Sequence, residues 1–215
     1  MKLPVAAAIA AATLGAGTAR ADEVAETRAS IAIEERAYYA FERNTAYTFV
    51  GVGIVSAGAG AFLVTRSGDF ARGAGWSVLS LGVLQAIGAG AYKFQVDALD
   101  ERYAATLARD PAAYKREEGA HIAGTTSRFV FYRATELGLA LAGIAVATYG
   151  FVKDRDLWKG IGTGVAIEAI TFLTIDSFGT ARAHRYQEHV ERFRPEVTLD
   201  LGGGGPWGAS VRGRF

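Results

Sequence analysis

The strongest candidate for chemistry is Glu168, a carboxylate inside an otherwise uncharged stretch from 160 to 175. A charged residue near the middle of a membrane-spanning helix costs about 2.5–3.5 kcal/mol, so we expect it to face other helices and to have a partner there. Gln85, deep in another uncharged stretch, is the best polar candidate, and Thr171 lies one helical turn from Glu168. Two interpretations stay open: a proton or cation site between helices, or a protonated glutamate that holds helices together.

The histidines form a second set of candidates, because they occur with glutamates at helical spacing. Glu118 precedes His121, and beyond the last apolar segment Glu188 lies between His184 and His189. Residues at i, i+3 and i, i+4 share one face of a helix, so two neighbouring helices with these side chains could hold a metal ion. A full dinuclear site needs more glutamates and a second Glu-x-x-His. Solvated or interfacial histidines are therefore the favoured interpretation, and no cofactor is expected.

The composition excludes several classes of function. The chain has no cysteine, which excludes disulfides, Cys-ligated metal centres and a Cys nucleophile. Its net charge of +1 gives no electrostatic footprint for nucleic acid. The sequence contains no P-loop, dinucleotide fingerprint, Gly-x-Ser-x-Gly or His-Glu-x-x-His motif. We therefore expect a protein that is not an enzyme and that binds no nucleic acid.

The chain begins with the features of an export signal. Lys2 is followed by an uncharged, alanine-rich stretch, and Ala19-Arg20-Ala21 fits the small-x-small rule for cleavage. The apolar stretch is too short and too rich in alanine for a typical membrane span. We therefore expect residues 1–21 to be a removed signal peptide, with an uncleaved anchor as the alternative.

Four apolar segments predict membrane-spanning helices at about 45–65, 73–92, 134–152 and 158–178. The first two are free of charged residues, and each reaches the roughly 20 helical residues that cross a hydrocarbon core about 30 Å thick. Aromatic residues gather at the ends of the segments, as they do at membrane interfaces. Those expected at one level are Tyr38, Tyr39, Phe41, Tyr92, Phe94, Phe129, Phe131 and Tyr132, and those at the other are Trp76, Phe151 and Trp158.

Glycine is unusually frequent, with 27 among 215 residues. In water, each glycine inside a helix costs about 1 kcal/mol relative to alanine. In lipid, small residues instead let helix backbones approach closely. We therefore interpret the glycines of the apolar segments as helix-packing positions, most clearly Gly53, Gly60, Gly143 and Gly150.

The four segments form two related pairs. The sequence at 41–45 aligns with that at 131–135, in a register that superposes Gly53 and Gly60 on Gly143 and Gly150. In the second member of each pair, Gly75 aligns with Gly162. We interpret this as a tandem duplication of a helical hairpin, with chance similarity among Gly/Ala-rich segments as the alternative. The hairpins cover 22–110 and 111–195, and two spans per repeat give both copies the same orientation.

Apolar residues continue at helical spacing beyond the spans, as far as Asp110-Pro111 and Pro195. Each helix is expected to run on by roughly 15 residues, or about 22 Å, and these extensions form a bundle outside the membrane. In residues 196–215, apolar residues alternate with other residues on both sides of a glycine run. This pattern predicts a short C-terminal β-hairpin or an irregular tail. The predicted fold class is an all-α membrane protein of four long helices.

Cleavage of the signal would leave both chain ends on the periplasmic side of a bacterial inner membrane, with the two short loops inside. The distribution of Lys and Arg supports this orientation only weakly. These features favour a non-enzymatic structural or interaction component of the cell envelope, whose partners are the lipid bilayer and either itself, as a homo-oligomer, or other envelope proteins. A small oligomeric transporter or channel that uses Glu168 is the alternative.

Overall fold

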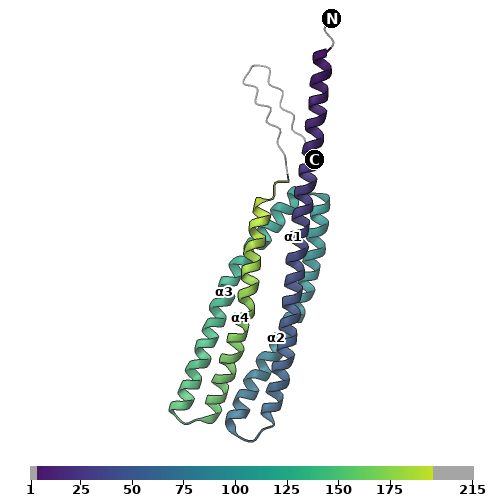
Figure 1. Ribbon diagram of the computed structural model, residues 1–215. Helices are drawn as coiled ribbons and strands as arrows, with labels where there is room; N and C mark the ends of the chain where they lie inside the picture. Colours follow the sequence, from purple (N-terminus) through teal and green to yellow (C-terminus); the bar gives the residue numbers. More distant parts are fainter. Residues whose placement is uncertain (1–3, 196–215) are drawn as a thin grey trace.

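Four long helices make up the described part of the chain in the computed structural model (Figure 1). The structure describes the backbone of residues 4–195 and the side chains of residues 25–195. The helices are α1 (Pro4–Val64), α2 (Asp69–Arg109), α3 (Pro111–Val152) and α4 (Asp156–Arg192). The prediction of four long helices is confirmed over these residues. The predicted C-terminal β-hairpin at 196–215 lies outside them.

Local chemistry explains where the helices begin and end. Asp110 ends α2 and caps α3: its Oδ1 accepts a hydrogen bond from the Ala113 amide at 2.9 Å, and Pro111 takes the first helical position, where no amide hydrogen is needed. The α1–α2 loop turns at Gly68, whose φ of 115° suits glycine. In the α3–α4 loop, Asp154 adopts a φ of 48° and pairs with the Lys159 ammonium at 2.7 Å.

The helices form two antiparallel hairpins that stand side by side (Figure 1). α1 packs along α2 and α3 packs along α4, while the two hairpins meet mainly through α2 and α4. Both hairpin loops lie at one end of the bundle, and the α2–α3 junction lies at the other. The two ends of the bundle, called here the loop end and the junction end, are packed in different ways.

Near the loop end, the helices touch through glycine. A Cβ atom on Gly53 would lie 2.7 Å from the backbone of Gly82, and one on Gly143 would lie 2.6 Å from the backbone of Ala166. Toward the junction end, the core is instead made of large side chains, as in a water-soluble bundle. These buried side chains are Ile31, Tyr38, Tyr39, Val96, Tyr103, Leu107, Tyr114, Ile122, Tyr186, Val190 and Phe193.

The outer surface toward the loop end is strongly apolar. Val55, Leu84 and Val152 are 71%, 66% and 74% exposed, and many other large apolar side chains of the same region are also exposed. A surface of this kind is unfavourable in water but suits hydrocarbon. All four helices are long and apolar enough to cross a membrane. The chain is therefore a membrane protein by the length and composition of its helices.

Candidate functional site

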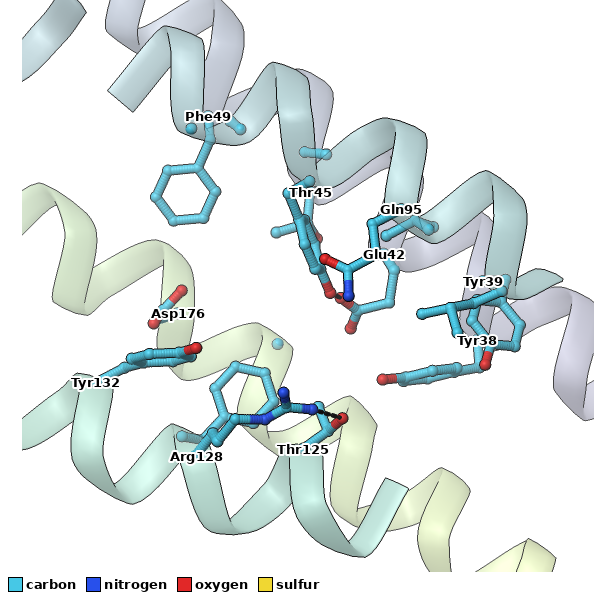
Figure 2. Close-up of a pocket in the computed structure, with 18 of the residues that line it drawn as sticks. Tyr38, Tyr39, Glu42, Thr45, Phe49, Gln95, Thr125, Arg128, Tyr132 and Asp176 are labelled. Atoms are coloured by element: carbon cyan, nitrogen blue, oxygen red, sulfur yellow. Dashed lines mark hydrogen bonds between the residues drawn. The ribbon is translucent and has the colours of Figure 1, made fainter. Parts of the chain in front are cut away.

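A cavity of about 550 Å³ lies between the two hairpins, where the predicted spans pass into their extensions (Figure 2). All four helices contribute to its walls, although α4 supplies only two of the lining residues. The principal polar and aromatic lining residues are Tyr38, Tyr39, Glu42, Phe49, Gln85, Tyr92, Gln95, His121, Arg128, Phe129, Tyr132, Glu136 and Asp176.

The lining residues follow helical spacing, which is why straight helices bring them together. On α1, Tyr38, Glu42 and Phe49 lie on one face, and α3 presents a similar stripe from His121 to Glu136. The cavity stays open because several residues facing it are small. These residues are Ala46, Gly88, Ala89 and Gly179.

Glu42 is the most deeply buried carboxylate of the cavity, with 4% of its surface exposed. The Tyr92 hydroxyl donates to its Oε2 at 2.5 Å, while its Oε1 has no hydrogen-bond partner. Burial raises the pKa of Glu42, and the hydroxyls of Tyr92 and Tyr38 oppose this shift only in part. The site therefore contains a buried carboxyl group with an acceptor atom still free.

Glu136 of α3 and Asp176 of α4 form a carboxyl pair on the other side of the cavity. The two carboxyl groups act on each other electrostatically, and Glu136 Oε2 has no hydrogen-bond partner. Figure 2 shows Asp176 and Tyr132 across the cavity from Glu42.

A cluster of tyrosines and glutamates closes the cavity toward the junction end. The Tyr39 hydroxyl donates to Glu118 Oε1 at 2.9 Å, and the hydroxyls of Tyr114 and Tyr186 hydrogen-bond at 2.8 Å. Burial raises the pKa of Glu118 to about 8, against the hydrogen bonds from Tyr39 and Tyr186, which lower it. Burial also raises the pKa of Glu35 to about 7. This end of the bundle is therefore a polar but tightly packed core.

No protein-family model, curated protein or solved structure matches this chain. Its own geometry shows where the sequence-predicted residues lie.

The three residues predicted around Glu168 are not hydrogen-bonded to one another. Glu168 is buried on α4, with 3% of its surface exposed, and the polar side chain that acts on its carboxyl group is Ser56 of α1. Gln85 lines the cavity, and both polar atoms of its side chain lack a partner. The Thr171 hydroxyl donates to the Ile167 carbonyl of its own helix at 2.9 Å. The expected pairing of Gln85 with Glu168 is thus replaced by a contact to a serine that the sequence did not single out.

The five residues considered for a metal site do not come together. Glu118 lies in the core, hydrogen-bonded to Tyr39, and the His121 ring lies 5.5 Å from the Tyr103 ring at a tilt of 37°. His184, Glu188 and His189 are exposed on α4, where Glu188 pairs with Arg192. Among the residues described, no group of three histidines, aspartates or glutamates could hold a metal ion.

The four glycines predicted as packing positions each lie against the backbone of a neighbouring helix. Gly53 and Gly60 of α1 meet α2 at Gly82 and Gly75, and Gly143 of α3 meets α4 at Gly162. Gly150 meets α4 at its first turn, beside Trp158 and Lys159. At these positions a Cβ atom would collide with backbone atoms rather than with a movable side chain.

Sequence reasoning missed the cavity and assigned some of its aromatic residues to the membrane interface. Tyr38 and Tyr39 are only 2% and 1% exposed, so they belong to the core, whereas Phe94 and Phe131 are 71% and 69% exposed, as an interfacial residue should be. One sequence pattern could have indicated the cavity: aromatic and acidic residues at helical spacing just where a predicted span ends, as at Tyr38 and Glu42.

Proposed function

We propose that this chain is a bacterial inner-membrane protein with a structural or interaction role in the cell envelope. In this proposal the part of the bundle toward the loop end lies in the lipid bilayer. The part toward the junction end lies outside the bilayer, on the exported side. One observation carries it: the same four helices change from glycine-mediated packing with an apolar exterior to a core of large side chains. A bilayer boundary between the two halves accounts for both kinds of packing.

The cavity supports an interaction role over transport by a single copy. Its lining reaches Phe49, Gln85, Glu136 and Asp176 but does not include Glu168. Toward the loops, close backbone contacts of Gly60 with α2, and of Gly160 with α2 from α4, bring the helices together. The lining of the cavity in a single copy therefore does not extend to the loops.

The predicted signal peptide at 1–21 and the tandem duplication belong to the same proposal. Cleavage after Ala21 would leave the new chain end, the α2–α3 junction and the C-terminal tail on the periplasmic side. Use of glycine contacts in both hairpins supports a common origin. Their registers differ, however: Gly75 faces Gly60, whereas its aligned counterpart Gly162 faces Gly143.

Single-cysteine variants test both the orientation and the interaction role, because the natural chain contains no cysteine. Glu101→Cys places a thiol on the exposed surface of the α2 extension, and Ser67→Cys places one in the α1–α2 loop. In spheroplasts, a membrane-impermeant maleimide is expected to label Glu101→Cys and to reach Ser67→Cys only after lysis. An impermeant thiol-to-amine crosslinker on Glu101→Cys is expected to give discrete adducts larger than the monomer.

The Ser67→Cys variant is the matched control, since it carries the same thiol at the other end of the bundle. Labelling of Ser67→Cys in intact spheroplasts, with Glu101→Cys protected, would show that the chain has the opposite orientation. Labelling of Glu101→Cys without any adduct, to itself or to another envelope protein, would contradict the interaction role.

A small oligomeric transporter or channel is the second candidate, and Glu168 is the observation in its favour. Its carboxylate is buried in a predicted span with Oε2 unpartnered, although Ser56 satisfies part of the group. On this hypothesis, Glu168→Gln should abolish a pH- or ion-dependent flux in proteoliposomes, while the exposed Glu101→Gln leaves it intact. A flux that is unchanged in Glu168→Gln, or absent from the natural protein, removes the transport hypothesis.

A further inference from the structure

Three carboxyl groups gather around the cavity between the hairpins. Glu42, Glu136 and Asp176 all line it. None of the ion pairs among the described residues involves any of these three carboxyl groups. A buried carboxyl group keeps its negative charge only when a cation lies beside it, because an isolated charge in a medium of low polarity is unfavourable.

Free hydrogen-bonding atoms point to a missing partner in the same place. Glu42 is more than nine-tenths buried, and its Oε1 has no partner. Both side-chain polar atoms of Gln85, at the deep end of the cavity, are also buried without a partner, as is Glu136 Oε2. Buried polar atoms are rarely left unsatisfied in native proteins. Figure 2 shows the Glu42 carboxylate directed into the space between the hairpins.

The walls of the cavity select for an organic rather than an inorganic cation. Aromatic rings surround the acidic groups, and such rings attract ammonium groups through their negative faces. A volume of about 550 Å³ is much larger than a metal ion requires and lies within the range of about 300–1,000 Å³ usual for small-molecule sites. The rings are those of Tyr38, Tyr39, Phe49, Tyr92, Phe129 and Tyr132.

We propose that this cavity binds an organic ammonium ion with apolar substituents. Glu42 faces the charge from α1, the Glu136–Asp176 pair faces it from α3 and α4, and the aromatic rings hold the apolar groups. This proposal goes beyond the envelope role and does not depend on it.

Arg128 is the one arginine among the lining residues. It makes its hydrogen bonds to its own helix and not to the carboxyl groups of the cavity. Its Nε donates to the Gly124 carbonyl at 3.2 Å and its Nη2 donates to Thr125 Oγ1 at 3.1 Å, both on its own helix. The side chain is exposed at the rim, together with Gln95 and Tyr132. A ligand is therefore expected to enter at this rim, where the predicted spans end.

An ammonium ion at this depth could come from two sources. It could be the head group of a membrane lipid that reaches the cavity from the side, or a free amphipathic cation from the exported side. Both present the same charge and the same apolar neighbourhood to Glu42, so the experiment includes an arm for each source.

Equilibrium dialysis of the full-length protein in maltoside micelles tests the proposal, with benzyltrimethylammonium as the probe. We expect saturable binding, which neopentylbenzene, the neutral carbon isostere, does not displace. Glu42→Gln keeps an acceptor for Tyr92 but removes the charge, and is expected to weaken binding roughly tenfold or more. Asp176→Asn gives a second, independent variant with the same expected direction. Glu101→Gln removes a carboxylate from the exposed surface and should bind as the natural protein does.

Added lipids then distinguish the sources. Displacement of the probe by phosphatidylcholine, but not by phosphatidylglycerol, identifies a lipid head group, and displacement by neither identifies a free cation; both outcomes support an ammonium site. The proposal is overturned if binding does not saturate, if neopentylbenzene competes equally well, or if folded Glu42→Gln and Asp176→Asn bind as tightly as Glu101→Gln. Circular dichroism establishes that each variant is folded.

Discussion

Gly60→Ala is expected to destabilise the first hairpin by about 3 kcal/mol, although it adds a single methyl group. In the structure, a Cβ atom at this position would run into the backbone of Leu79 and lie 2.7 Å from the Gly75 carbonyl oxygen. Backbone cannot rotate out of the way as a side chain can, so α1 and α2 would have to separate. Thermal unfolding in maltoside micelles, followed by circular dichroism, measures the loss.

Gly58→Ala is the matched control for this change. Gly58 lies two residues before Gly60 on the same helix, but a Cβ atom there meets nothing within 4 Å. The same methyl group should therefore leave the unfolding temperature unchanged or raise it, since alanine favours the helix by about 1 kcal/mol over glycine. Equal effects of the two substitutions would contradict a packing role for Gly60.

The contrast between Gly58 and Gly60 also marks what the sequence could and could not predict. The number of helices, their type and their approximate ends followed from apolar runs, from Asp110-Pro111 and from the glycine excess. Those signals are local to one helix. Which of two nearby glycines faces a neighbour depends on how two helices are rotated against each other, and no single segment encodes that rotation.

The candidate site was harder to predict for the same reason. Tyr39 finds its partner Glu118 at a separation of 79 positions, and Glu168 finds Ser56 rather than Gln85. Position along a span can be read from the sequence, and it singles out Glu168 and Gln85 as polar residues within apolar segments. Lateral neighbours cannot be read in this way, because many polar residues share each depth.

Stability is expected to fall as the pH rises, because burial raises the pKa of Glu118 to about 8 in the folded protein. The ordinary pKa of this group is 4.5, so between these values the folded state holds a proton that the unfolded state releases. The free energy of unfolding therefore decreases with rising pH across this window and levels off above pH of about 8. A shift of this size corresponds to a loss on the order of 5 kcal/mol.

Other titrating groups decide where this effect is best measured. Burial raises the pKa of Glu35 to about 7 and also raises that of Glu42, so both add to the loss of stability. Burial lowers the pKa of His121, which gives an opposite trend near its ordinary value of 6.5. Measurements from about pH 7 to about pH 9 avoid most of the histidine contribution and still include Glu118.

Glu118→Gln isolates the contribution of this one carboxyl group. The glutamine side chain has nearly the shape of the protonated acid, and its oxygen still accepts the hydrogen bond from Tyr39, but it cannot ionise. The variant should lose less stability than the natural protein between about pH 7 and about pH 9, and it should be the more stable of the two at the upper limit.

The neighbouring residue supplies the control for this prediction. Glu117→Gln makes the same chemical change at a partly exposed carboxylate that pairs with Arg102 at 2.7 Å. Exposed ion pairs contribute little to stability. The pH dependence of the stability of Glu117→Gln should therefore follow that of the natural protein. If Glu118→Gln and Glu117→Gln gave the same pH profile, Glu118 would be ionised in the core at neutral pH. The junction end would then hold a buried negative charge stabilised by tyrosine hydroxyls, rather than a neutral network of hydrogen bonds.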